Sequence, residues 1–204
     1  MTTAYELNNI KVFHQNVCAL NIEKLQIDSG KCIALLGQNG AGKSTLLNLL
    51  AFTAKANQGT INLFDQLITN KLKAKQRRRI AMVDQQPYLL SGSVRDNIRL
   101  ALKLQGIDHV QHSSLIEKTL QQLNLTHLAE QAAQSLSGGE LKRVAIARAI
   151  VYDPDILLLD EPFSHLDHRH IKQLETAIQT FAQQPDKTVI FSTHDHPQGL
   201  AIAD

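Results

Sequence analysis

The segment GQNGAGKST at positions 37–45 has the residue types and spacing of a phosphate-binding loop, G-x-x-x-x-G-K-[ST]. In such a loop the backbone N–H groups surround the phosphates, the lysine reaches the terminal phosphates and the last hydroxyl turns toward Mg²⁺. Lys43 and Ser44 take these two positions. The sequence therefore predicts a nucleotide site made by Gly37, Gln38, Asn39, Gly40, Ala41, Gly42, Lys43, Ser44 and Thr45.

The chain on either side of this loop has the elements that the loop needs. CIALL (32–36) is a short apolar run suited to a buried parallel strand, and residues 44–50 open a helix whose positive end faces the phosphates. The glycines let the chain turn sharply between the two. Three further apolar runs, 80–83, 156–159 and 189–191, have the length of central parallel strands.

Polar residues follow these three strands at Gln85, Asp160 and His194. Ligands in open α/β sheets bind beyond the carboxyl ends of the strands, so we expect these side chains to converge on one site. Asp160 and Glu161 place two carboxylates beside the expected phosphates. The alternative is that Asp-Glu-Pro only ends a strand in a turn.

The segment LSGGE (136–140) allows two readings. Ser137 and Glu140 fit a capping box that opens an amphipathic helix over 141–151. Glycine in a first helical turn is costly, however, and two glycines beside a serine leave amides and a hydroxyl free for an anion. Phosphate contact explains Gly138 and Gly139 better than capping alone.

The remaining patterns predict an α/β fold. Alternating runs at 5–13, 19–27 and 59–64 predict a leading group of antiparallel strands. Capping boxes at 93–96 and 114–117 start Leu-rich helices, which predicts a helical insertion between Gln85 and Ser137.

Composition restricts the function less than the motifs do. The chain has 204 residues and a formal net charge of +2. A basic run at Lys71, Lys73, Lys75, Arg77, Arg78 and Arg79 is read as a solvated face. No apolar stretch approaches the about 20 residues that span a bilayer, and no secretory signal opens the chain. Cys18 and Cys32 are expected as reduced thiols in a cytosolic protein.

From Tyr5 onward the chain resembles the nucleotide-binding subunit of an ATP-binding cassette (ABC) transporter, with LSGGE as the signature motif. The resemblance implies one domain over 1–204, with a P-loop NTPase core, an N-terminal antiparallel β-subdomain and an inserted α-helical subdomain at about 88–145. It also implies ATP and Mg²⁺ as cofactors. Two cassettes would pair head to tail, so that Ser137, Gly138 and Gly139 contact the partner's γ-phosphate.

The same resemblance suggests roles for single residues. Asp160 would hold Mg²⁺ with Ser44, and Glu161 would orient and deprotonate the attacking water. Gln85 would be the Q-loop glutamine that touches Mg²⁺, with Gln86 as the alternative register. His194 would be the switch histidine.

Asp167 resembles the D-loop aspartate, which communicates across the dimer. The other histidines are expected in solvated positions: His109, His112, His127, His168, His170 and His196.

Some positions depart from the family pattern. His14 stands where an aromatic residue usually stacks on adenine, and Phe13 is the alternative. His165 replaces the common D-loop alanine, and Glu140 stands where glutamine is frequent. The match also stops early after His194, which indicates either a short cassette or a truncated one, with core surface that would need a partner.

The resemblance implies an ATP-hydrolysing subunit that is membrane-associated through permease chains on the cytoplasmic face. The expected partners are a second cassette, most simply an identical one, the permease and a solute-binding protein, with no nucleic acid. Residues 91–107 resemble bacterial importers, including those for oxyanions such as tungstate or phosphate. The alternatives are a soluble ABC ATPase acting as a mechanical or regulatory switch, and a nucleotide-binding module without turnover, against which Asp160 and Glu161 argue.

Overall fold

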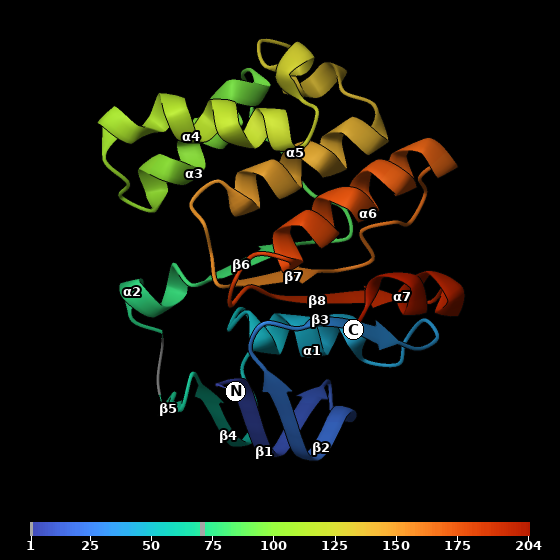
Figure 1. Ribbon diagram of the computed structural model, residues 1–204. Helices are drawn as coiled ribbons and strands as arrows, with labels where there is room; N and C mark the ends of the chain where they lie inside the picture. Colours follow the sequence, from blue (N-terminus) through green and yellow to red (C-terminus); the bar gives the residue numbers. More distant parts are fainter. Residues whose placement is uncertain (1, 70–71) are drawn as a thin grey trace.

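The strands form two sheets, one antiparallel and one parallel (Figure 1). The computed structural model describes residues 2–69 and 72–204. Its strands are β1 (Thr3–His14), β2 (Val17–Asp28), β3 (Cys32–Leu36), β4 (Gln58–Leu63), β5 (Gln66–Leu67), β6 (Ile80–Val83), β7 (Ile156–Leu159) and β8 (Thr188–Thr193). Its helices are α1 (Lys43–Leu50), α2 (Ala74–Arg77), α3 (Val94–Leu104), α4 (His109–Gln122), η1 (Thr126–Leu128), η2 (Ala133–Ser135), α5 (Gly138–Ile150), α6 (His168–Ala182) and α7 (His196–Ile202).

The antiparallel sheet has the order β2-β1-β4-β5. A two-residue turn at Gln15 and Asn16 joins β1 to β2, and both residues have positive φ, at 47° and 68°. This backbone twist matches that of the paired strands. The leading antiparallel strands predicted from the sequence are therefore confirmed.

The parallel sheet has the order β3-β8-β7-β6 and lies at the centre of the molecule. Successive side chains of a strand point to opposite faces, and both faces of this sheet are covered. Along β7, Ile156 and Leu158 belong to one core cluster, and Leu157 and Leu159 belong to the other. All four residues are buried, which is why this strand reads as an uninterrupted apolar run.

The layers are clear in Figure 1. Helix α1 lies between the two sheets, α5 and α6 cover the other face of the parallel sheet, and α3 and α4 lie beyond them. Polar loops follow the carboxyl ends of β6, β7 and β8, as the sequence predicted. No helix in the described ranges is both long and apolar enough to cross a membrane.

The two predicted starts of the inserted helices have different outcomes. The Ser93–Asp96 capping box is present at the start of α3. The predicted start at 114–117 is wrong, because α4 begins at His109, where the carboxylate of Asp108 accepts a hydrogen bond from the N–H of Val110. Ser114 lies inside α4, and its hydroxyl donates to the carbonyl of Gln111.

Two expectations about polar side chains also need correction. His112 is only 4% exposed and bonds through Nε2 to the carbonyl oxygen of Ile107 at 3.0 Å, so it is not solvated. In the basic run, Arg79 forms an ion pair with Asp155 and stacks 3.4 Å from the ring centre of Phe64. This cation therefore has a structural role.

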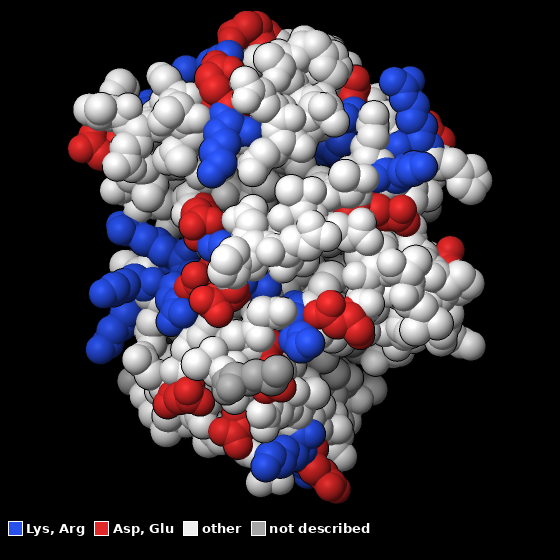
Figure 2. Space-filling view, viewed as in Figure 1, with Lys and Arg blue, Asp and Glu red and all other residues white. Residues whose placement is uncertain are grey.

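The other described members of the basic run are exposed. Lys and Arg side chains gather at the left of Figure 2, over α2. The exposed members there are Lys73, Lys75, Arg77 and Arg78. Lys71 lies outside the described residues.

Candidate functional site

The phosphate-binding loop joins β3 to α1 and packs against β2. Gly42 caps α1 with φ at 89°, a conformation that favours glycine. A Cβ at this position would lie 2.9 Å from the carbonyl oxygen of Ala19, so space also requires glycine here. The cap supplies no side-chain hydrogen bond, and the first-turn N–H groups of α1 have no partner within the helix. The helix start can therefore receive an anion.

Lys43 turns its side chain back across this loop. Its Nζ donates to the carbonyl oxygen of Gly37 at 2.7 Å and to that of Gln38 at 3.1 Å. The same Nζ lies 3.8 Å from Oε1 of Glu161. The lysine therefore holds one positive charge between the loop and the carboxylate that follows β7.

Glu161 is where the separate segments meet. His194 Nδ1, after β8, lies 3.6 Å from Oε1 of Glu161. Gln85 Nε2, after β6, donates to Oε2 at 3.2 Å. The structure thus brings together four side chains that were singled out from the sequence, and we call Lys43, Gln85, Glu161 and His194 the Glu161 cluster.

Asp160 is held beside this cluster by a residue that sequence reasoning missed. The hydroxyl of Ser192 donates to Oδ1 of Asp160 at 2.6 Å and accepts from the N–H of Glu161 at 2.8 Å. Ser192 is fully buried on β8, and Asp160 is 7% exposed. A serine two residues before His194, in a strand next to β7, was the available signal.

Lys142 is the second residue that sequence reasoning missed. Its Nζ donates to the carbonyl oxygens of Glu161 at 3.3 Å and Ser164 at 2.7 Å. Glu161 itself has φ at 42°, a left-handed conformation that is unusual for a residue other than glycine. Burial lowers the pKa of Lys142, and the nearby Glu161 carboxylate opposes this shift. Lys142 therefore fixes the turn that presents Glu161.

The LSGGE segment hydrogen-bonds within itself. Oε2 of Glu140 accepts from the N–H of Ser137 at 2.8 Å and from its hydroxyl at 2.7 Å, which lowers the pKa of Glu140. A Cβ on Gly139 would lie 2.5 Å from the ring of His170, whereas a Cβ on Gly138 would meet nothing within 4 Å. Packing against α6 therefore explains the glycine at position 139. Packing does not explain the glycine at position 138, where a side chain would meet no neighbour among the described residues.

Asp167 has a local role in this chain. Its Oδ1 accepts from the N–H of His170 at 2.9 Å and caps α6. Hydrogen bonds from the His170 N–H and then from its ring lower the pKa of Asp167. Among the described residues, the side chains of Ser137 and Asp167 bond to Glu140 and His170 of their own segments and do not reach the Glu161 cluster.

The two candidates for stacking on adenine lie together at the end of β1. Phe13 and His14 are both exposed, and the N–H of Phe13 donates to Oδ1 of Asn57 at 2.9 Å. Their strand pairs with β2, which contacts Gly42. The hairpin therefore borders the phosphate-binding loop, and both residues stay candidates.

A family model described as ABC transporter matches residues 20–164, a range that contains the phosphate-binding loop, the LSGGE segment and Glu161. The chain belongs to the ABC transporter family. The resemblance to this family that was predicted from the sequence is therefore confirmed, and ABC ATP-binding subunits are ATP hydrolases coupled to transport.

Curated relatives of this ABC protein are named for import of several substrates. The spermidine/putrescine import ATP-binding protein PotA of Oleidesulfovibrio alaskensis is 33% identical over 98% of this chain and 53% of its own. The phosphate import ATP-binding protein PstB 2 of Natronomonas pharaonis is 38% identical over 88% of this chain and 67% of its own. The tungstate uptake system ATP-binding protein TupC of Peptoclostridium acidaminophilum is 32% identical over 97% and 90%. The chain spans about half the length of this PotA protein and of other PotA proteins that it matches.

Solved ABC cassettes confirm the fold class. The structure of cbiO1 from Clostridium perfringens, part of an ABC transporter complex, superposes with a TM-score of 0.85 at 28% identity, over 96% of this chain and 80% of that one. A bacterial ABC transporter cassette solved as a dimer superposes with a TM-score of 0.86 at 25% identity, over 96% and 90%.

The donor set of this ABC chain fits Mg²⁺. The described residues hold no ready-made group of three or more His, Cys, Asp or Glu side chains for a metal. Mg²⁺, however, is usually held by one or two carboxylates together with waters and substrate phosphates. Asp160 supplies one buried carboxylate next to Glu161, whose own carboxylate lies 3.8 Å from Lys43, and Ser44 supplies a hydroxyl in the first turn of α1.

Proposed function

We propose that the chain is the ATP-binding and ATP-hydrolysing subunit of an ABC importer. The observation that carries this proposal is the convergence of Lys43, Gln85 and His194 on the carboxylate of Glu161. Phosphoryl transfer needs mainly positioning and charge neutralisation, and this cluster can supply both.

Each cluster member has a chemical task in this proposal. The loop amides and Lys43 bind the phosphates of ATP, and Glu161 accepts a proton from the attacking water. Gln85 and His194 orient that water and the γ-phosphate. Asp160, Ser44 and Gln85 would hold Mg²⁺, which neutralises phosphate charge when it is bound.

In the proposed dimer, the LSGGE segment of one chain completes the ATP site of the other chain. The amides at Gly138 and Gly139 open α5, and a helix start attracts phosphate. We infer that Ser137, Gly138 and Gly139 of one chain contact the ATP held by the loop of its partner, with Asp167 near the shared boundary. A two-fold pair of identical chains would form two such sites.

Contacts from the site to the inserted helices support a coupling role. Gln85 is followed by a loop whose Leu90 exchanges two hydrogen bonds with the side chain of Asn97, at 2.8 and 3.0 Å. Asn97 is buried on α3. A movement of Gln85 on hydrolysis can therefore reach α3, in the helical subdomain predicted at about 88–145.

We further propose membrane partners and a class of substrate. The helical subdomain would pass its motion to membrane-spanning permease chains on the cytoplasmic face, with a solute-binding protein delivering substrate. An inorganic oxyanion is the proposed substrate, supported by relatives named for phosphate, tungstate and sulfate/thiosulfate import. Other relatives are named for spermidine/putrescine import.

The test uses the Glu161→Gln variant, expressed in its source cells and trapped with ATP. It is purified from a detergent extract, and its companions are identified by mass spectrometry, with the Lys43→Ala variant as the control that should not trap ATP. Co-purifying proteins with several membrane spans support the proposal and name the permease. Only soluble or ribosomal companions would favour the non-transport switch instead.

A further inference from the structure

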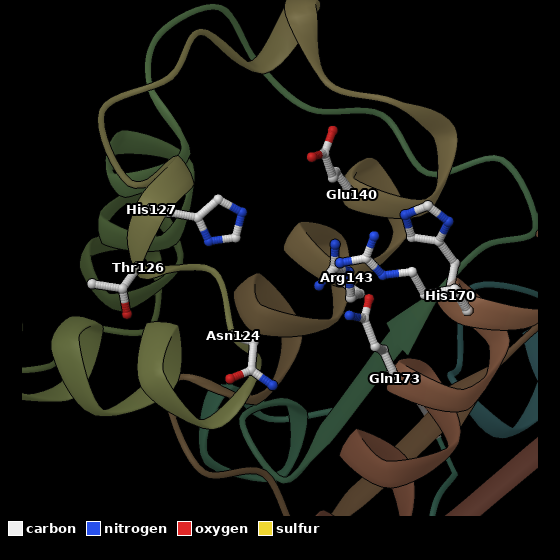
Figure 3. Close-up of a pocket in the computed structure, with 8 residues that line it drawn as sticks. Asn124, Thr126, His127, Glu140, Arg143, His170 and Gln173 are labelled. Carbon is white, nitrogen blue, oxygen red and sulfur yellow. The ribbon is translucent and has the colours of Figure 1, made fainter.

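A cavity of about 640 Å³ lies where η1, the first half of α5 and the start of α6 meet (Figure 3). Its lining includes no member of the Glu161 cluster. The volume falls within the range of about 300–1,000 Å³ that is usual for small-molecule sites.

Arg143 is a buried cation in this lining whose hydrogen bonding is incomplete. The residue is only 5% exposed, and its Nε is buried without a hydrogen-bond partner among the described residues. Figure 3 shows the Arg143 side chain in the middle of the cavity, between His127 and Gln173. A buried guanidinium N–H without an acceptor is costly, so an acceptor entering the cavity would be bound favourably.

The cavity also has excess positive charge. Arg169 lines it together with Arg143. Burial lowers the pKa of Arg143 first, the nearby Glu140 carboxylate raises it, and repulsion from Arg169 lowers it by less, although an arginine stays charged at neutral pH. Glu140 is the acidic residue of the lining, but its Oε2 already accepts two hydrogen bonds from Ser137. One carboxylate therefore faces two arginines, and an entering anion would be attracted by the positive charge that remains.

Whereas Arg143 presents an unpaired donor, Gln173 presents an unpaired acceptor within the described part of the chain. Its Oε1 is buried and has no hydrogen-bond partner among the described residues. This acceptor lies on α6 and lines the same cavity as Arg143. A ligand that satisfies both residues must carry negative oxygens for the guanidinium and a hydroxyl for the amide oxygen. Hydrogen phosphate has both.

We propose that this cavity binds a phosphate group together with a hydroxyl, either as inorganic phosphate or as a small phosphate ester. Arg143 and Arg169 bind the charged oxygens, and Gln173 accepts from the hydroxyl. The bound group would join α5 to α6 behind the LSGGE segment. This site is separate from the ATP site and does not depend on the function proposed above.

The test must remove binding at the phosphate-binding loop, so it starts from the Lys43→Ala variant. Inorganic phosphate and glycerol 3-phosphate are titrated by calorimetry into this variant and into the same variant carrying Arg143→Gln. Arg148→Gln is the matched control, because it removes the same charge from the same helix outside the cavity lining. We expect saturable binding that Arg143→Gln weakens at least about tenfold, as for other lost charged contacts, and that Arg148→Gln leaves unchanged.

A second measurement uses crystals of the Lys43→Ala variant soaked in arsenate. It tests the proposal even if the Arg143→Gln variant does not fold. Hydrogen arsenate has the shape and protonation of hydrogen phosphate, and its anomalous signal should lie within hydrogen-bond distance of Arg143. Tighter binding of glycerol 3-phosphate would identify an ester as the ligand, and tighter binding of phosphate would identify the free ion. No saturable binding, equal binding after Arg143→Gln, or no arsenic peak in the cavity would overturn the proposal.

Discussion

The amide of Gln85 donates a hydrogen bond to the carboxylate of Glu161 at 3.2 Å, although the two residues are 76 positions apart in the chain. They meet because β6 and β7 are paired neighbours and each residue follows the carboxyl end of its strand. The bond fixes one oxygen of the proposed general base.

Replacing Gln85 should therefore slow hydrolysis more than it weakens ATP binding. We expect Gln85→Leu to lower kcat about tenfold or more, which corresponds to about 1.4 kcal/mol of lost transition-state stabilisation. The matched control is Gln86→Leu, since Gln86 is exposed and adjacent. Steady-state ATPase assays and nucleotide titrations check this, and a larger loss in Gln86→Leu would move the role to that residue.

Lys142 should act on the site through the turn at Glu161. Lys142→Met leaves the carbonyl oxygens of Glu161 and Ser164 without their shared donor. We expect a loss of about 1–3 kcal/mol in the free energy of unfolding and a lower kcat at unchanged ATP affinity. Urea denaturation and ATPase assays measure these. Lys118→Met, at an exposed position of α4, is the control, and an unchanged kcat in Lys142→Met would refute the positioning role.

The two glycines of the LSGGE segment should respond differently to a methyl group. Gly139→Ala places a Cβ about 2.5 Å from the His170 ring and should lower the free energy of unfolding by about 1–3 kcal/mol. Gly138→Ala meets nothing within 4 Å and should be neutral or slightly stabilising. Adding His170→Ala should restore part of the stability lost in Gly139→Ala. Equal melting temperatures for the two single variants would contradict this packing.

The capping box of α5 should make part of the stability depend on pH. Hydrogen bonds from the hydroxyl and N–H of Ser137 lower the pKa of Glu140 in the folded chain. Its contribution is therefore complete above the unfolded pKa of about 4.3 and is lost as pH falls through the lower folded value. Glu140→Gln should lose less stability than the natural chain between about pH 6 and pH 3. Urea denaturation across this range tests it, and parallel curves would exclude the effect.

How much could be predicted from the sequence depended on whether the interaction is local. The strand Cys32–Leu36 and the capping boxes at Ser93 and Ser137 follow from short patterns, and the structure has them. Ser192 and Lys142 could not be assigned, because their partners near Glu161 are set by the pairing of β7 with β8 and by the approach of α5. His112 was misjudged because its burial depends on how α4 packs.

The Glu161→Gln variant is the direct test of Glu161 as the general base. Its ATP turnover is compared with that of the natural chain, ATP binding is measured by titration, and mass with and without ATP is measured by light scattering. We expect turnover lower by about 10²–10⁴-fold, retained ATP binding, and a dimer that accumulates with ATP. Turnover equal to that of the natural chain would contradict the assignment of Glu161 as the general base.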